Sequence, residues 1–432
     1  MIFFIAVAFY YYPQLAVATG YASKKMCTCS FVSGRSEDEV VRNDLYFSIL
    51  SIVNTDINVK DSSVVSTIFG LAPNTAKYKN GLGCILLPDN KDDYNVAVAP
   101  FSNKDTIIEL FATEKGMTKG IDKKRLMQAV DGAFDADGKL DDKRTTAILI
   151  IHKDTLIVEK YAPPFHKNMA QLGWSMTKSW MNTMAGIMVL QGKLKPDQKQ
   201  LFEEWKGDVR KDITVQHLLQ MNSGLAWAED YTTVSDATKM LYKSEDVAYI
   251  PLSKQLVHPL GKFWYYSSGT SNLLSKLYRN ILGDASYHSY LKQNFFSPLG
   301  MNSAFIETDE TGTFIGSSYG YATPRDWAKF GLLYLHDGVI FGKRYLPEAW
   351  VNFSASEATG SQGKYGAQFW LNKRGSQYPD APHDMLIADG FQGQYVLIIP
   401  SHQTVIVRMG TGGENFDVNA FIKEVLSAFP KE

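Results

Sequence analysis

The chain has 432 residues, of which 45% are hydrophobic and 21% are charged, a balance typical of a folded globular protein and not of a disordered or fibrous one. It carries 44 basic and 45 acidic side chains, so the formal net charge of −1 excludes a strong field that would steer it to nucleic acid or to an anionic membrane. We therefore expect a small molecule as the partner and no nucleic acid.

Residues 1–22 are predicted to form a signal peptide or a membrane anchor. Met1 to Tyr12 are all apolar or aromatic, and Ala16 to Ala18 offer the small side chains that a signal peptidase accepts. Membrane attachment is the alternative, because Phe3 to Ala22 is long enough to span a bilayer. No basic residue precedes the apolar run, so the flanking charges leave its orientation open. We expect an exported protein, periplasmic or anchored facing the periplasm.

Residues 23–118 form an N-terminal extension in which short β-like runs, such as Gly83 to Leu87, alternate with polar turns. The three cysteines are too few for a disulfide scaffold, and their spacing does not fit a zinc site. In an oxidising compartment, one of Cys27 or Cys29 is expected to bond to Cys84.

Residues 119–432 are predicted to form the functional domain. A helix begins near Ile121 and ends before Gly138, because Leu126, Val130 and Phe134 recur at helical spacing. Two apolar runs separated by a polar turn then predict a β-hairpin, and their continuous hydrophobicity predicts central strands. These runs are residues 145–151 and 156–161.

A second hairpin and a helix close the chain, with strands at 395–399 and 404–409 and an amphipathic helix at 417–429. Helices fill the interval between the hairpins, at 215–220, 272–281 and 324–335, the last with Thr323 as N-cap and Pro324 in its first turn. This order predicts an α/β protein of the α+β type, with an antiparallel sheet flanked by helices and an inserted helical subdomain. The sheet part is assigned to about 119–192 and 300–432, and the insertion to about 193–299.

A Ser-x-x-Lys pair is the first candidate for chemistry. Ser175 and Lys178 lie three residues apart at the start of a predicted helix, so their side chains share one face. A serine hydroxyl needs an adjacent base, and lysine is a base only when it is neutral. Burial and the positive end of the helix dipole both disfavour the ammonium form. The same helix start offers the Ser175 main-chain N–H as half of an oxyanion hole.

Two downstream motifs make the Ser175 and Lys178 pair a more specific indication of a catalytic site. Tyr266-Ser267-Ser268-Gly269 precedes a predicted helix, and Gly390-Phe391-Gln392-Gly393-Gln394 leads into the strand of the closing hairpin. The glycines of the second motif permit close approach of the main chain to a ligand.

The order of these three motifs resembles the penicillin-recognising serine hydrolases. The chain is most similar to their class C β-lactamase and esterase branch, in particular the 6-aminohexanoate-dimer (nylon oligomer) hydrolase group. The resemblance covers about residues 120–430, with further matches at 218–225, 322–331 and 408–410. It implies a β-lactamase/DD-peptidase-like fold and a serine hydrolase that cleaves amide or ester bonds of small molecules through an acyl-enzyme. No cofactor and no metal are expected.

The resemblance also implies roles for individual residues. Ser175 would be the acylated nucleophile, Lys178 its proton acceptor, and Tyr266 the proton shuttle to the leaving group and to the deacylating water. Residue chemistry alone favours Tyr266 no more than Tyr265. Phe391 would supply the second oxyanion N–H. The expected substrate-binding residues are Ser268, Gly390, Gly393 and Gln394.

The chain departs from the β-lactamase pattern at two motifs. Ala388-Asp389-Gly390 stands where Lys-Thr-Gly is expected, and Tyr266-Ser267-Ser268 stands where Tyr-x-Asn is expected. The cation that holds a β-lactam carboxylate is therefore missing from its usual place. We expect weak or no action on penicillins, with a β-lactamase or DD-peptidase as the alternative activity.

Two other interpretations compete. Gly316 to Gly320 matches the Gly-x-Ser-x-Gly nucleophile elbow, but it lacks the strand directly before and the helix directly after the serine. A non-catalytic envelope sensor with the same fold is the alternative from another class, which the intact Ser175 and Lys178 disfavour.

Overall fold

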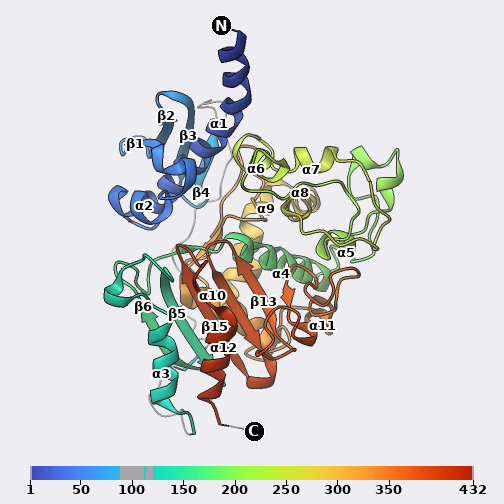
Figure 1. Ribbon diagram of the computed structural model, residues 1–432. Helices are drawn as coiled ribbons and strands as arrows, with labels where there is room; N and C mark the ends of the chain where they lie inside the picture. The colour runs from blue at the N-terminus through green and yellow to red at the C-terminus, as the bar shows by residue number, and fades with distance from the viewer. Residues whose placement is uncertain (1, 88–110, 113–119, 431–432) are drawn as a thin grey trace.

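The computed structural model describes residues 2–87, 111–112 and 120–430, with side chains of the first helix from Tyr12 onward (Figure 1). A six-stranded sheet with the order β12-β13-β14-β15-β5-β6 supports the functional domain, and every adjacent pair is antiparallel. Its strands are β5 (Thr145–His152), β6 (Thr155–Tyr161), β12 (Trp370–Leu371), β13 (Leu386–Gly390), β14 (Gln394–Ile399) and β15 (Thr404–Gly410).

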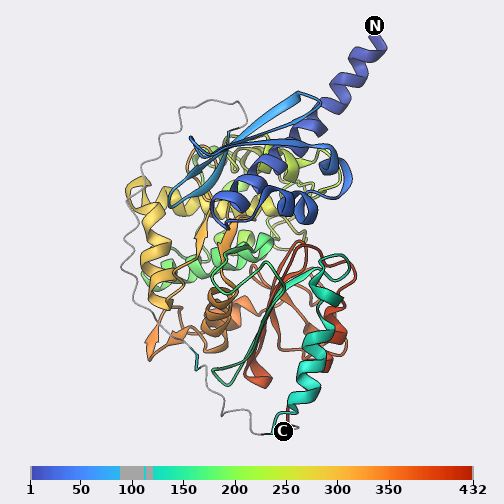
Figure 2. The same ribbon diagram turned by 90° about the vertical axis from the view of Figure 1, so that its left-hand side faces the viewer.

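Helices cover both faces of this sheet, because side chains alternate along each strand. On β5, Leu149 and Ile151 pack toward α4 (Thr177–Leu190) and α10 (Pro324–Leu335), while Ile148 and Ile150 pack toward α3 (Lys123–Gly132) and α12 (Val418–Ser427). Figures 1 and 2 show the sheet between these two helix layers. The expected antiparallel sheet flanked by helices is confirmed.

The two predicted hairpins are present, and one detail of the prediction is wrong. Among the described strands β6 lies at the end of the sheet, next to β5, although its apolar run predicted a central strand, and Ala112 forms a short bridge to its first residue, Thr155. Apolar residues on an edge strand still pack when helices cover the sheet face, as Val158 does against the α3 side. The predicted cap of α10 is confirmed, since the Thr323 side chain accepts from the Asp326 N–H.

Helices separate the hairpins in the chain, in the expected order. They are α5 (Val215–Leu219), α6 (Asp236–Tyr242), α7 (Tyr249–Ser253), α8 (Ser268–Leu282) and α9 (Asp284–Leu291). Small elements complete this part: β7 (Gln171–Leu172), β8 (Phe305–Ile306), β9 (Gly320–Ala322), β10 (Val339–Ile340), β11 (Lys343–Arg344) and α11 (Trp350–Ser354).

The N-terminal region forms a folded layer of its own, drawn in blue in Figure 1. A four-stranded antiparallel sheet in the order β1-β2-β3-β4 packs against α1, and their shared core includes Trp174 and Tyr319 of the functional domain. The elements are α1 (Ile2–Phe31), α2 (Glu37–Asp44), β1 (Asn54–Asn58), β2 (Ser63–Ile68), β3 (Leu71–Lys79) and β4 (Gly83–Leu87).

Helix α1 runs through the expected boundary at residue 22 without a break. Ala18, Tyr21 and Ala22 are buried in the fold, whereas the first turns of the helix extend away from the body in both views (Figures 1 and 2). Cleavage after Ala18 would remove that residue but leave the buried Tyr21 and Ala22 in place, and removal of a leader stays a prediction. Within the described residues, no helix has both the length and the apolar character needed to cross a bilayer.

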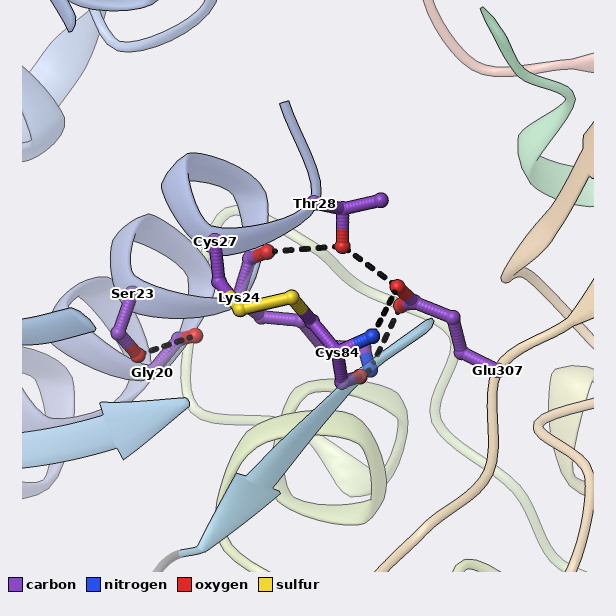
Figure 3. The surroundings of a disulfide bond; sticks show 7 residues. All are labelled: Gly20, Ser23, Lys24, Cys27, Thr28, Cys84 and Glu307. Carbon is purple, nitrogen blue, oxygen red and sulfur yellow. Dashed lines mark hydrogen bonds and ion pairs between the residues drawn. A yellow bond between two sulfur atoms is a disulfide. The ribbon is translucent and has the colours of Figure 1, made fainter. Parts of the chain in front are cut away.

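A disulfide and a buried ion pair fasten α1 (Figure 3). Cys27 bonds to Cys84 of β4, which confirms the expected disulfide and selects between its two candidates, and Cys29 remains a buried free thiol. Next to the disulfide, Lys24 Nζ lies 2.8 Å from a Glu307 carboxylate oxygen, and both side chains are fully buried. Because Glu307 follows β8, these contacts join the N-terminal layer to the functional domain.

Candidate active site

Ser175 lies in a tight turn between β7 and α4. The turn is a single 3₁₀ segment, Trp174–Met176, and helix α4 begins directly after it at Thr177. Trp174 has a φ of 47°, a strained conformation for a residue with a side chain. The indole N–H of Trp174 donates to Gln392 Oε1 at 3.2 Å, so the residue before Ser175 is fixed by its packing. The sequence predicted one helix that carries both Ser175 and Lys178; in the structure Ser175 lies in a 3₁₀ turn and Lys178 in the α-helix that follows it.

Lys178, one turn further, reaches back to Ser175. Its Nζ lies 3.0 Å from Ser175 Oγ, and the residue is 1% exposed. Desolvation lowers the pKa of Lys178 to about 8, although the charge of Glu229 acts in the opposite direction. An appreciable fraction of this lysine is therefore neutral near physiological pH, as its predicted role requires.

The other two contacts of Lys178 decide how its protons are distributed. Nζ lies 2.7 Å from the main-chain oxygen of Ser317 and 3.0 Å from Ser268 Oγ. The Ser317 oxygen can only accept, and Ser268 donates its own proton to Glu229 at 2.5 Å. Lys178 is therefore the hydrogen-bond donor in both contacts. A neutral amine has two protons and one lone pair, so its lone pair is left for the hydroxyl of Ser175.

Tyr266 completes the set of side chains at Ser175. Its hydroxyl is hydrogen-bonded to Ser175, and its ring centroid lies 4.9 Å from Lys178 Nζ. The ring stacks on Trp370 at 5.2 Å. Desolvation raises the pKa of Tyr266 well above its ordinary value, and the charge of Glu229 adds to the effect. Tyr266 therefore stays protonated and can donate. Tyr265, which residue chemistry left equally eligible, is 41% exposed.

The end of β13 meets the turn that carries Ser175, where the sequence predicts an oxyanion hole. A Cβ at Gly390 would lie 2.1 Å from the Gly173 main-chain oxygen, so only glycine permits this approach. The N–H groups of Ser175 and Phe391 have no acceptor in the described part of the chain. Two unpaired donors, one in the Ser175 turn and one directly after β13, are what a developing oxyanion requires.

Three residues expected to bind substrate have other partners. Ser268 is held between Lys178 and Glu229, inside the proton network. Gln394 is 2% exposed and its amide bonds to main-chain groups, including the Gly410 oxygen at 2.6 Å. A Cβ at Gly393 would lie 2.0 Å from Arg408, which anchors this turn. In the structure these residues contact the protein itself, and their role in substrate binding stays a prediction.

Glu229 is the site residue that sequence reasoning missed. Its carboxylate accepts from the main-chain N–H and hydroxyl of Ser268, from the Trp227 indole, and from the Tyr231 hydroxyl at 2.7 Å. It lies in the loop between α5 and α6, which has no regular spacing to the other motifs. The one signal available was an acid flanked by aromatic residues, which is too common to identify a site.

The N-terminal layer also reaches the site. The ring of Phe47 contacts the ring of Phe391 edge to face, with centroids 6.5 Å apart, and Phe391 is 55% exposed. Residues 23–118 carry no chemical motif, so this contact could not be predicted.

The segment 316–320 is not a nucleophile elbow. Ser318 is buried at 3% exposure, and Ser317 contributes its main-chain oxygen to Lys178. Within the described ranges, no group of three or more histidine, cysteine or acidic side chains gathers at a possible metal position.

Comparisons with known proteins give concordant results. Residues 130–425 match the family model described as Beta-lactamase. A 6-aminohexanoate-dimer hydrolase of Paenarthrobacter ureafaciens is 23% identical over 305 residues, which cover 64% of this chain and 75% of that protein.

Two solved structures have a similar fold. A penicillin-binding protein homologue from Caulobacter crescentus has a TM-score of 0.56 and 16% identity, covering 71% of this chain and 97% of the other. A family VIII carboxylesterase has a TM-score of 0.57 and 13% identity, with the same two coverages.

Proposed function

The chain belongs to the Beta-lactamase family and is a serine hydrolase, and from this premise we propose that Ser175 cleaves amide or ester bonds of small molecules through an acyl-enzyme. Lys178 is the proposed base and Tyr266 the proposed proton donor. The predicted β-lactamase and DD-peptidase activities are the less favoured alternatives.

Acylation begins when Ser175 Oγ attacks the carbonyl carbon of the substrate. The hydroxyl proton passes to the lone pair of Lys178, and the carbonyl oxygen becomes an oxyanion held by the N–H groups of Ser175 and Phe391. When the oxyanion collapses, the bond to the leaving amine or alcohol breaks. Tyr266 donates a proton to that group and is reprotonated from Lys178.

Deacylation runs through the same groups in reverse. Water takes the place of the leaving group, loses a proton through Tyr266 to Lys178, and attacks the ester carbon. Ser175 Oγ leaves and recovers a proton from Lys178. The net reaction adds one water to the bond and returns the site to its starting protonation.

The proton distribution around Lys178 carries this proposal. Its contacts with Ser317 and Ser268 both use N–H groups, which leaves the lone pair of a neutral amine facing Ser175 at 3.0 Å. An ordinary surface lysine would be hydrated and charged, and would be no base. A buried amine with a pKa of about 8 supports the proposed role.

Covalent labelling tests the nucleophile. A fluorophosphonate probe is expected to add one adduct mass to the wild type and none to Ser175→Ala. Ser318→Ala, the matched control in the rejected elbow, should label like the wild type. Labelling that persists in Ser175→Ala would overturn the assignment, and absence of labelling in every variant would favour a non-catalytic sensor.

We further propose that the substrate lacks the carboxylate of a β-lactam. Ala388 and Asp389 offer no cation at the strand position where the family pattern has Lys-Thr. A chromogenic cephalosporin is expected to be a poor substrate compared with p-nitrophenyl esters. Rapid turnover of the cephalosporin would contradict this proposal.

We also propose that the protein is exported. The disulfide Cys27–Cys84 supports an oxidising compartment, because structural disulfides are rare in the cytosol. Cell fractionation with alkylation of free thiols tests the proposal. Reduced Cys27 and Cys84 in a cytosolic protein would overturn it.

A further inference from the structure

Asp389 is an acidic residue beside the proposed site that has no hydrogen-bond or ion-pair partner among the described residues. It is the fourth residue of β13, directly before Gly390, whose main chain abuts Gly173. In the described part of the chain its side chain forms no hydrogen bond and no ion pair, although it is partly buried. Partly buried charges are normally paired, so an unpaired one at a reacting centre needs an explanation.

Three tyrosines lie within electrostatic range of this carboxylate. Tyr395 lies directly opposite Asp389 on β14, and Tyr378 is hydrogen-bonded to Tyr395. The charge of Asp389 acts on the phenols of Tyr378, Tyr395 and Tyr266 and raises the pKa of each, in addition to the larger effect of desolvation. Asp389 therefore lies within electrostatic range of the proposed proton donor Tyr266. A carboxylate beside aromatic rings is the usual environment that binds an ammonium group.

Within the described residues, no cationic side chain is paired with Asp389. Arg408 lies in the same row of the sheet, one strand beyond Tyr395, but its donors bond to Thr145 and to main-chain oxygens. Lys178 is committed to its three contacts. Desolvation raises the pKa of Asp389 to about 7, and a cation bound beside it would favour the charged carboxylate.

We propose that Asp389 is a specificity-determining residue that binds a positively charged ammonium group on the leaving-group side of the substrate. This inference rests on the proposed hydrolase function and names its substrate class: cationic esters or amides. The leaving-group side follows from the electrostatic link to Tyr266, which faces the departing atom. A carboxylate at this position would repel the anionic group that a β-lactam presents.

A matched pair of substrates tests the proposal. Acetylthiocholine carries a quaternary ammonium, and 3,3-dimethylbutyl thioacetate is its neutral isostere; both release a thiol that can be followed by colour. The wild type is expected to show a kcat/KM for the cationic ester about tenfold or more above that for the neutral one, mainly through KM. In Asp389→Asn this ratio should fall to about one. Glu348→Gln removes an exposed carboxylate outside the site and should keep the wild-type ratio.

The outcomes separate this inference from the function on which it rests. Turnover of both esters with a ratio near one in the wild type would overturn the ammonium site and leave the hydrolase standing. A ratio that Asp389→Asn does not change would also overturn it. If neither ester is hydrolysed, binding of tetramethylammonium measured by calorimetry decides: binding by the wild type that Asp389→Asn loses supports the site, and equal or absent binding rejects it.

Discussion

The indole ring of Trp174 stacks on the phenol ring of Tyr21, with centroids 5.9 Å apart and planes 13° apart. Trp174 directly precedes the proposed nucleophile in a strained conformation, and Tyr21 belongs to α1. Strain at one residue persists only when its surroundings hold it. The N-terminal helix therefore supports the geometry of the Ser175 turn.

Tyr21→Ala is expected to reduce both stability and turnover. Tyr21 is 8% exposed, so its truncation should lower the free energy of unfolding by about 3 kcal/mol, as for other buried aromatic residues. Loss of the stacking partner should also lower kcat, because Ser175 is less well held. Urea unfolding and ester hydrolysis measure the two effects. Tyr12 lies on the same helix and is 48% exposed, so the control variant Tyr12→Ala should change the free energy of unfolding by less than about 0.5 kcal/mol. Equal behaviour of the two variants would contradict the coupling.

The pH dependence of kcat/KM should report the neutral form of Lys178. Its pKa of about 8 lies below the ordinary value, so the neutral fraction and the rate on a neutral ester should rise with pH and level off above about 8. The pKa of Tyr266 is raised, so no fall in rate should follow before strongly alkaline pH. A neutral ester avoids the ionisation of Asp389, which titrates near pH 7.

Replacing Lys178 tests the same base by substitution. Lys178→Ala should lose roughly 10³-fold or more in kcat/KM. Lys178→Arg should be equally inactive, because a guanidinium stays charged and cannot accept the proton. Lys276→Arg, at a lysine paired with Asp246 outside the site, is the control that should keep activity. An active Lys178→Arg enzyme would eliminate the lysine-base mechanism.

Glu229→Gln should move the pH profile to lower pH. The charge of Glu229 raises the pKa of Lys178, so its removal lets desolvation lower that pKa further. A lower rate is also expected, because the amide of glutamine presents donors to the Ser268 N–H and hydroxyl. Glu229→Asp keeps the charge and should leave the midpoint near its wild-type value. A profile that moves to higher pH in Glu229→Gln would contradict the electrostatic assignment.

The sequence predicted those features that depend on local pattern. Ser175 and Lys178 were found because three-residue spacing at a helix start brings the side chains together, and the hairpins because apolar runs flank a polar turn. Glu229 and Phe47 were not found, because each reaches the site through a loop whose path is set by packing far along the chain. Gln394 was predicted to bind substrate from its motif, but its buried hydrogen bonds to the main chain could not be predicted, because they depend on the packing of β14 against β15.

The apolar start of the chain shows the same limit. Composition distinguishes poorly between a leader and a buried helix, since both are apolar. What identifies the later part of α1 as structural is the set of residues that follow the apolar run: Lys24, Cys27 and Thr28 each contact a partner more than fifty positions away. Such contacts carry no local signature.

Removing one charge of the buried pair Lys24 and Glu307 should lower the free energy of unfolding more than removing both. Either Lys24→Met or Glu307→Gln leaves one buried charge without its partner, which should lower the free energy of unfolding by about 3–5 kcal/mol. In the double variant no buried charge remains, and the glutamine oxygen can still accept from Thr28 and from the Cys84 N–H. The double variant should therefore be more stable than either single one in urea. Additive losses would show that the two side chains do not interact.

The disulfide Cys27–Cys84 should contribute stability chiefly by restricting the unfolded chain. It joins residues 57 positions apart, and a closed loop of that length corresponds to about 4 kcal/mol in the chain-entropy model. Cys84→Ala should therefore unfold at a markedly lower urea concentration than the wild type, and reducing agent should lower the wild-type midpoint to a similar value. Cys29→Ala is the matched control, because that buried thiol is free and its truncation keeps the bond. Reducing agent should still act on Cys29→Ala and have no effect on Cys84→Ala.

Activity should be lost at the same urea midpoint as the fold, because α1 holds the turn that carries Ser175. Hydrolysis that survives reduction at a urea concentration where α1 has detached would refute that dependence.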